Sequence, residues 1–192
     1  MIRNLAADVR AFTSNAFLVA GERTVLVDPG NEFDVVSRVR DATGGLDAVV
    51  LTHTHSDHVG NVDAVTEAFD VEVRGFDPDN DLVDHAIADG DTVVLGDHDY
   101  TALHTPGHKD DHLCFVRADG EVAVVGDLVF SGGGFGRTDL EEGDRPRLVE
   151  SIEYLLAETD DSLAAMHAGH GPSVEANARQ HIEYALRAAR SR

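Results

Sequence analysis

The stretch of residues 51–60 constrains the fold of this chain more than any other. It follows the apolar run of residues 48–51 and places three imidazoles and one carboxylate within six consecutive residues. In an extended segment alternate side chains share a face, so the first two imidazoles point the same way. A helix beginning near Ser56 would turn the other two groups in a different direction. The stretch therefore predicts a metal site after a buried strand, and its four ligand-type residues can serve two neighbouring metal positions: His53, His55, Asp57 and His58.

Apolar runs and turn residues divide the chain into a β-rich start followed by alternating helices and strands. This order is typical of the α/β class. The length of 192 residues suits one core, so we expect a single domain over residues 1–192. The predicted strands are residues 9–13, 15–20, 24–27, 48–51, 71–74, 92–95, 100–104, 113–116, 121–125 and 163–166. The predicted helices are residues 33–43, about 60–69, 147–158 and one that begins after Ser173.

The composition is strongly acidic. Asp and Glu number 36 against 15 Lys and Arg, a net charge of −21, and Lys109 is the single lysine. Such a surface repels itself in dilute buffer and is screened by dense salt. We therefore expect a halophilic source. The same charge makes binding to a large nucleic acid unfavourable, because the chain has no basic stripe that would release counterions.

The single cysteine, Cys114, lies in an apolar run and is expected to be a buried core thiol rather than a nucleophile. The first 30 residues lack a basic start followed by an apolar core, and no run approaches the ~18 apolar residues of a membrane span. We expect a soluble, cytoplasmic protein with no membrane partner.

Three further ligand-type residues each follow an apolar β-run and lie next to a glycine: His108, Asp127 and His170. Residues beyond the ends of neighbouring strands gather along one edge of a sheet, where α/β folds bind ligands. Histidine and carboxylate ligands favour zinc or a similar borderline metal. The chain thus offers seven candidate ligands for one site. For the stretch of residues 51–60 the alternative is a solvent-exposed loop rich in His and Asp after a buried strand.

These motifs resemble those of the metallo-β-lactamase fold superfamily. They are His-x-His-x-Asp-His at residues 53–58, Thr-Pro-Gly-His ending at His108, Gly-Asp ending at Asp127 and Gly-His-Gly around His170. Asp28-Pro29-Gly30 resembles the earlier Asp motif of the superfamily. Residues 126–130 and 136–139 resemble the small glyoxalase II-like hydrolases, which act on hydroxyacylglutathione-type thioesters. The resemblance implies an αβ/βα four-layer sandwich of two mixed β-sheets flanked by helices.

The resemblance also implies the roles of the candidate residues. His53, His55 and His108 would hold one metal ion, Asp57, His58 and His170 a second, and Asp127 would bridge both. Asp57 and Asp127 are the implied catalytic carboxylates, and Asp28 would orient the His-rich turn from behind. We expect His112 to support a ligand in the same way rather than to line the site. The expected cofactors are two divalent ions, zinc first and iron or manganese as alternatives.

Two such ions activate water, so the implied function is hydrolysis of a small thioester or related ester. Phosphodiester cleavage by a nuclease or phosphodiesterase of the same fold is the first alternative, and a mononuclear-iron persulfide dioxygenase is the second. A regulatory protein without activity is a further hypothesis. We expect a small-molecule substrate, and the oligomeric state stays open. Arg137 is either a substrate contact or the structural partner of Asp139.

Overall fold

The computed structural model describes residues 1–191. The chain divides into two compact units, Met1–Ile87 with Val93–Asp99, and Ala88–Thr92 with the residues from Tyr100 onward. The single domain over residues 1–192 stays a prediction, and its last residue, Arg192, lies outside the described residues.

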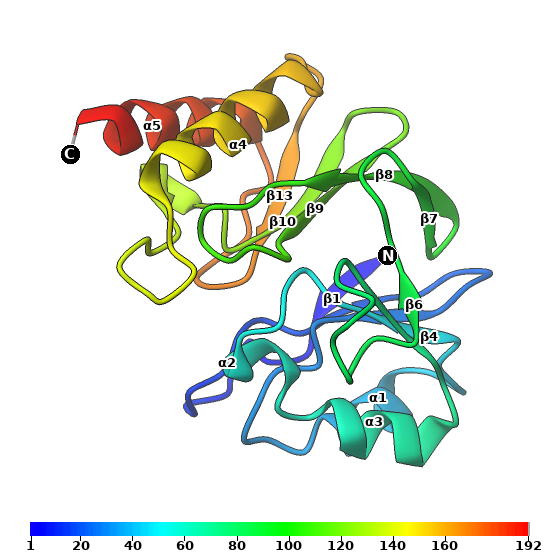
Figure 1. The fold of residues 1–192 in the computed structure, drawn as a ribbon. Helices are drawn as coiled ribbons and strands as arrows, with labels where there is room; N and C mark the ends of the chain where they lie inside the picture. Colours follow the sequence, from blue (N-terminus) through cyan, green and yellow to red (C-terminus); the bar gives the residue numbers. More distant parts are fainter. Residues whose placement is uncertain (192) are drawn as a thin grey trace. The chain divides into compact units, whose positions relative to one another are not determined.

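The first unit contains a six-stranded mixed sheet with the order β1-β2-β3-β4-β5-β6 (Figure 1). The three N-terminal strands pair antiparallel, and β3 to β6 pair parallel. Parallel pairing brings the carboxyl ends of β3 and β4 to the same edge, so the residues that follow them become neighbours. The strands are β1 (Ile2–Asn4), β2 (Phe17–Val19), β3 (Val25–Val27), β4 (Ala48–Val50), β5 (Val73–Gly75) and β6 (His85–Ala86).

Helices α1 (Val35–Ala42) and α3 (Val62–Phe69) cover one face of this sheet, and α2 (Ser56–Val59) is a single turn after the His-rich stretch. Asp34 caps α1 by accepting a hydrogen bond from the main-chain N–H of Ser37. The buried valines of α1 and α3 pack on alternate residues of β3 and β4, among them Leu26 and Val49. The apolar burial that holds the helices thus also fixes the strands that lead to the candidate ligands.

The second sheet has the order β13-β10-β9-β8-β7 and is also mixed, since β10 pairs antiparallel with β9 and parallel with β13. A two-stranded sheet, β11 with β12, flanks a 3₁₀ turn, η1 (Ser131–Gly133). The strands are β7 (Thr92–Leu95), β8 (His98–His104), β9 (Leu113–Arg117), β10 (Val122–Gly126), β11 (Val129–Phe130), β12 (Gly134–Phe135) and β13 (Ala165–Ala168).

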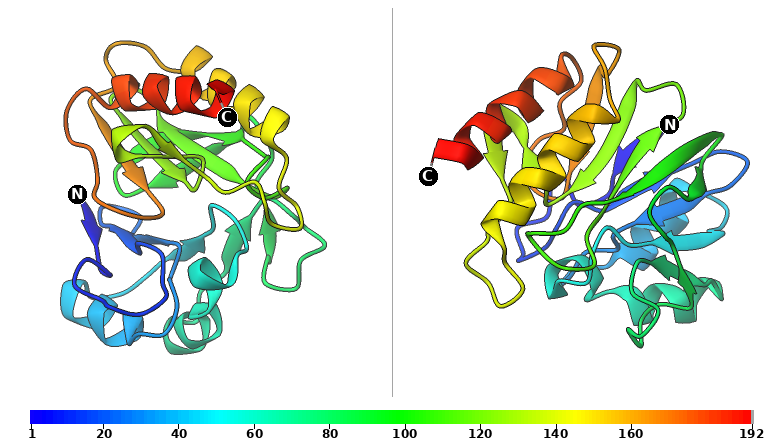
Figure 2. Two further views of the ribbon diagram at one scale, coloured as in Figure 1. Left: turned by 90° about the vertical axis from the view of Figure 1, so that its left-hand side faces the viewer. Right: turned by 45° about the horizontal axis from the view of Figure 1, so that its top comes forward.

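Helices α4 (Arg145–Ala157) and α5 (Ala178–Ser191) lie together over one face of this second sheet (Figure 2). Their apolar stripes, Leu148, Ile152 and Leu155 on α4 and Ile182 and Ala185 on α5, are fully buried. They pack against the face of the sheet that carries Cys114, Ala123 and Val125. The buried thiol expected at Cys114 is confirmed.

The α/β class with two mixed sheets and flanking helices is confirmed. The strand predicted over residues 9–13 is wrong, because this segment is a loop in which Phe12 is exposed. The side chain of Asn4 closes that loop by accepting hydrogen bonds from the main-chain N–H groups of Ala6 and Ala16. The short strands β1, β6, β11 and β12 were not predicted. Among residues 1–191, no helix is long and apolar enough to cross a membrane.

Candidate metal centre

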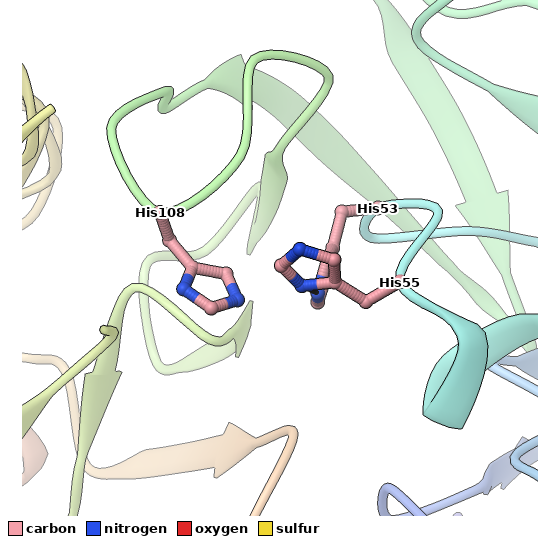
Figure 3. A group of neighbouring side chains, drawn as sticks. All are labelled: His53, His55 and His108. Carbon is pink, nitrogen blue, oxygen red and sulfur yellow. Dashed lines mark hydrogen bonds between the residues drawn. The ribbon is translucent and has the colours of Figure 1, made fainter. Parts of the chain in front are cut away.

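The first set of candidate ligands lies on the turn that follows β4. His53 is 1% exposed. Its Nε2 lies 3.0 Å from Nδ1 of His55, and Figure 3 shows both imidazoles on this turn, with His108 on the loop after β8. The turn is anchored where β4 ends, because the N–H of Leu51 donates to the carbonyl of Arg74 on β5.

Asp28 organises this turn from the end of β3. It is 2% exposed and has a positive φ of 52°, a conformation that non-glycine residues rarely adopt. Its Oδ1 accepts the main-chain N–H of Thr52 at 2.8 Å, and its Oδ2 accepts the Thr52 hydroxyl at 2.6 Å. Oδ2 also lies 2.9 Å from Nδ1 of His58. Asp28 thus contacts both the start of the turn and His58, and its orienting role stays a prediction.

These contacts fix which nitrogen of each imidazole carries a proton. His58 Nδ1 faces a carboxylate, so it carries the proton and leaves Nε2 as the ligand atom. The hydroxyl of Thr52 gives its one proton to Asp28, so it accepts from His53 Nδ1 at 3.1 Å and leaves Nε2 of His53 as an electron-pair donor. Carboxylates arranged behind histidines in this way are typical of metal sites.

The spacing of the donor atoms fits a divalent metal ion, for which zinc gives a reference distance. Two imidazole nitrogens on one tetrahedral zinc are roughly 3.3 Å apart, given Zn–N bonds of about 2.0–2.1 Å. The observed separation of 3.0 Å between His53 Nε2 and His55 Nδ1 is close to that value. Asp57 and His58 are 8% and 0% exposed, and the carbonyl of Asp57 accepts the N–H of Ser14. A buried group of this composition is suited to a cation.

The second set of candidate ligands lies in the second unit and begins with His108. Gly107 before it has φ 120°, and a Cβ there would lie 2.2 Å from the main-chain nitrogen of Leu148. Its carbonyl accepts the N–H of Asp144, so the loop is held against the start of α4. His108 Nδ1 lies 2.9 Å from the carbonyl of Arg137, which can only accept, so Nδ1 carries the proton and Nε2 is the ligand atom.

Asp127 lies between two histidines of this unit. Its Oδ2 is 3.5 Å from Nε2 of His108 and 3.4 Å from Nε2 of His170. The pairing of β10 with β13 shifts register between Val124 and Gly126, and the N–H of Gly169 donates to the carbonyl of Gly126. Because of this irregularity β10 and β13 end next to each other, and the residues that follow them, Asp127 and His170, become neighbours. A carboxylate between two ring nitrogens has the arrangement of a bridging ligand.

His112 contacts the main chain of Asp127, and its supporting role stays a prediction. It is fully buried, and its Nε2 accepts the main-chain N–H of Asp127 at 3.0 Å. Nδ1 therefore carries the proton and donates to Thr105 Oγ1 at 2.8 Å, and that hydroxyl donates to Cys114 Sγ at 3.3 Å. This chain of hydrogen bonds runs in one direction and requires a neutral imidazole at His112.

Thr52 and Thr105 are the residues that the sequence prediction missed. Each is fully buried and connects a histidine to a second polar group. Thr52 comes directly before the first histidine of the motif and Thr105 begins Thr-Pro-Gly-His. A threonine at the end of a buried strand beside such histidines was the available signal.

Other sequence candidates have local roles. Arg137 pairs with Asp139 through two 2.9 Å hydrogen bonds that use Nε and Nη2, and these bonds lower the pKa of the Asp139 carboxyl. His167 lies 2.9 Å from the hydroxyl of Ser173, and burial lowers its pKa. Burial also raises the pKa of the Cys114 thiol to about 12, which fits a core residue rather than a nucleophile.

Comparison with known sequences identifies related proteins. The model of the metallo-beta-lactamase superfamily matches residues 9–177. Hydroxyacylglutathione hydrolase GloC of Haemophilus influenzae is 29% identical over 188 residues, covering 85% of this chain and 88% of that protein. The probable metallo-hydrolase YqgX of Bacillus subtilis is 30% identical over 182 residues, covering 83% of this chain and 85% of that protein.

Solved structures agree with these matches. TTHA1623 in a di-iron-bound form is 29% identical with a TM-score of 0.75, and the match covers 91% of this chain and 94% of that one. The BLEG-1 B3 metallo-beta-lactamase is 25% identical with a TM-score of 0.77, with 94% and 96% covered. Because the family model spans most of the sequence and the related chains match over most of their lengths, this chain belongs to the metallo-beta-lactamase superfamily.

Proposed function

We propose that this protein is a metal-dependent hydrolase of a small thioester or related ester. The family membership supports metal-dependent chemistry, and the similarity to a hydroxyacylglutathione hydrolase over most of the chain supports the thioester. The observation that carries the proposal is the assignment of ring protons. Hydrogen bonds to Asp28, Thr52 and Arg137 leave Nε2 of three different histidines as electron-pair donors.

In this proposal the candidate ligands of both units together hold two divalent ions, and each ion takes ligands from both units. His53, His55 and His108 bind one ion, Asp57, His58 and His170 bind the other, and Asp127 is shared. Beside the shared Asp127, the three histidines His53, His55 and His108 favour zinc, while the group that adds a second carboxylate, Asp57, also suits iron or manganese. One related structure contains a di-iron form, which keeps iron among the candidates.

A bound pair of divalent ions would supply an activated water and polarise the bond under attack. The residues of this chain would supply orientation and proton transfer. Asp28 and His112 hold the ligands in the required direction and protonation state. Hydrolysis of a thioester yields a carboxylate and a thiol, so one proton of the water must reach the leaving sulfur. We assign this transfer to Asp57, whose side chain is buried.

Arg137 stays a candidate substrate contact. The side chains of Arg137 and Asp139 are 68% and 70% exposed. An ion pair this exposed contributes little to the stability of the fold. An approaching carboxylate could therefore replace Asp139 at little cost. The halophilic source and the cytoplasmic location rest on composition alone and stay predictions.

Parallel assays test the proposal. The full chain is incubated with an acyl thioester and with an aryl phosphodiester, and oxygen uptake is followed with a persulfide. Turnover of the thioester is expected, and Asp127→Ala should abolish it while the circular dichroism spectrum stays unchanged. Asp161→Ala, which removes a fully exposed carboxylate of the same unit, is the matched control and should keep full activity.

The other outcomes discriminate between the alternatives. Diester turnover without thioester turnover would replace the proposal by a phosphodiesterase. Oxygen uptake with a single iron would replace it by a persulfide dioxygenase. Absence of all three activities in metal-loaded protein would favour a regulatory protein that has no turnover.

A further inference from the structure

A cavity of about 460 Å³ lies in the second unit, and none of the candidate metal ligands lines it. Its walls are residues 133–139 of the glycine-rich segment, Arg145 at the start of α4 and Ala188 on α5. Of residues 133–139, four are glycine or phenylalanine, and Phe135 contributes an aromatic ring. Most of this lining cannot hydrogen-bond through side chains, and its polar side chains are those of Arg137, Thr138, Asp139 and Arg145.

Arg145 is held rigidly in this wall. Its Nε donates to the carbonyl of Ala189 at 2.9 Å, in the last turn of α5. Its guanidinium carbon lies 4.3 Å from the centre of the Phe135 ring, a cation–π contact. Its Nη2 has almost no exposed surface and finds no acceptor among residues 1–191, and Nε is already used, so Nη1 is the nitrogen left for a ligand. A guanidinium with an unsatisfied donor carries its full charge with few compensating contacts, so an anion beside Nη1 is favourable.

The charge balance of the cavity differs from that of the chain. Arg137 and Asp139 both line it and neutralise each other as an ion pair. Arg145 is then left as a net positive charge in a chain whose net charge is −21. An anion is therefore favoured here, and an oxygen of a carboxylate can accept a charge-assisted hydrogen bond from Nη1. The apolar lining selects an organic anion over a small inorganic one.

From these observations we propose that the cavity binds a small organic carboxylate. Arg145 would receive the carboxylate, and Phe135 and Ala188 would contact its apolar part. The proposal does not require hydrolysis by this protein. It does place the ligand beside the candidate metal centre, because Gly136 packs on His108 and the carbonyl of Arg137 orients that imidazole.

Calorimetric titration of the full chain with butyrate, at constant ionic strength, tests the proposal. Butyramide has nearly the same shape without the charge and should not bind, and inorganic phosphate should bind more weakly than butyrate. Arg145→Gln should weaken butyrate binding by about tenfold or more, since it removes the charge-assisted hydrogen bond. Arg147→Gln removes an exposed arginine two residues further along α4 and should leave binding unchanged.

A second variant covers the case in which Arg145→Gln does not fold, since Arg145 also binds the end of α5. Ala188→Leu fills the cavity and leaves Arg145 in place, so it should reduce butyrate binding to a similar extent. Binding that survives Ala188→Leu would show that butyrate binds elsewhere and would overturn the proposal. Equal binding of butyramide, tighter binding of phosphate, or an equal loss in Arg147→Gln would overturn it as well. Metal content is measured on every variant, so a defect of the metal centre is recognised separately.

Discussion

Replacing Asp28 by Asn should reverse the protonation of two candidate ligands. The N–H of Thr52 can only donate, so the amide oxygen of Asn must take the place of Oδ1. The amide NH₂ then takes the place of Oδ2, where it donates to Nδ1 of His58 and to the hydroxyl of Thr52. Nδ1 of His58 must become an acceptor, and its proton moves to Nε2. The Thr52 hydroxyl no longer donates to residue 28 and can donate to Nδ1 of His53, so the proton of His53 also moves from Nδ1 to Nε2.

The expected effect on metal binding follows from these two reversals. Loss of a carboxylate behind a metal-binding histidine costs about 10–100-fold in metal affinity. Each factor of ten corresponds to about 1.4 kcal/mol. Because His53 and His58 are at most 1% exposed, water cannot take over the role of Asp28. We therefore expect a loss of at least about 100-fold, or about 2.8 kcal/mol, for the more affected ion.

Competition with a chromogenic chelator measures the metal affinity, and ¹⁵N NMR of the imidazoles in metal-free protein reports the tautomers. Asp28→Asn should shift the proton of His58 from Nδ1 to Nε2. Asp34→Asn makes the same chemical change at the exposed cap of α1 and should leave both readouts unchanged. An Asp28→Asn protein with unchanged metal affinity, or with the proton of His58 still on Nδ1, would refute this reasoning.

Three further predictions concern the rest of the chain. Cys114, with a pKa of about 12, should resist thiol reagents in folded protein, since only about one molecule in 10⁴ is thiolate at pH 8, and should react on unfolding; rapid labelling of the folded chain would contradict its burial. Gly107→Ala should destabilise the fold by about 2–4 kcal/mol in denaturant titration, because its φ is 120° and its Cβ would meet the main chain of α4, whereas Gly45→Ala, with no atom within 4 Å, should be neutral. Burial lowers the pKa of His167, so the unfolded chain binds more protons than the folded chain. The stabilising contribution of neutral His167 should be complete above about pH 6.5 and be lost as the pH falls through the pKa of the folded state. The His167→Asn variant should therefore lose less free energy of unfolding between pH 7 and pH 5 than the parent chain. Equal losses in the two proteins would count against this assignment.

The fold was predictable where one local signal determined the structure. The apolar run before His53 forms β4, and the stripe from Leu148 to Leu155 forms most of α4. The helix predicted from about Gly60 begins at Val62, with a separate turn, α2, before it. Boundaries of this kind depend on tertiary hydrogen bonds, such as that from the N–H of Asn61 to the carbonyl of Gly30, which no local pattern encodes.

The candidate site was predictable in its residue types but not in its supporting contacts. Histidines and aspartates directly after apolar runs were visible in the sequence. The reversal of the chain at residues 9–13 was not, because it depends on the side chain of Asn4 and on pairing between β1 and β2. The roles of Thr52 and Thr105 were also hidden, since a threonine hydroxyl can donate in either direction until its neighbours are known.

Metal analysis of the purified chain tests the central claim most directly. Elemental analysis is combined with thioester turnover before chelation, after chelation, and after metal is restored. We expect two divalent ions per chain, loss of turnover on their removal and recovery when they are returned. Full turnover by protein stripped of all metal would contradict the claim.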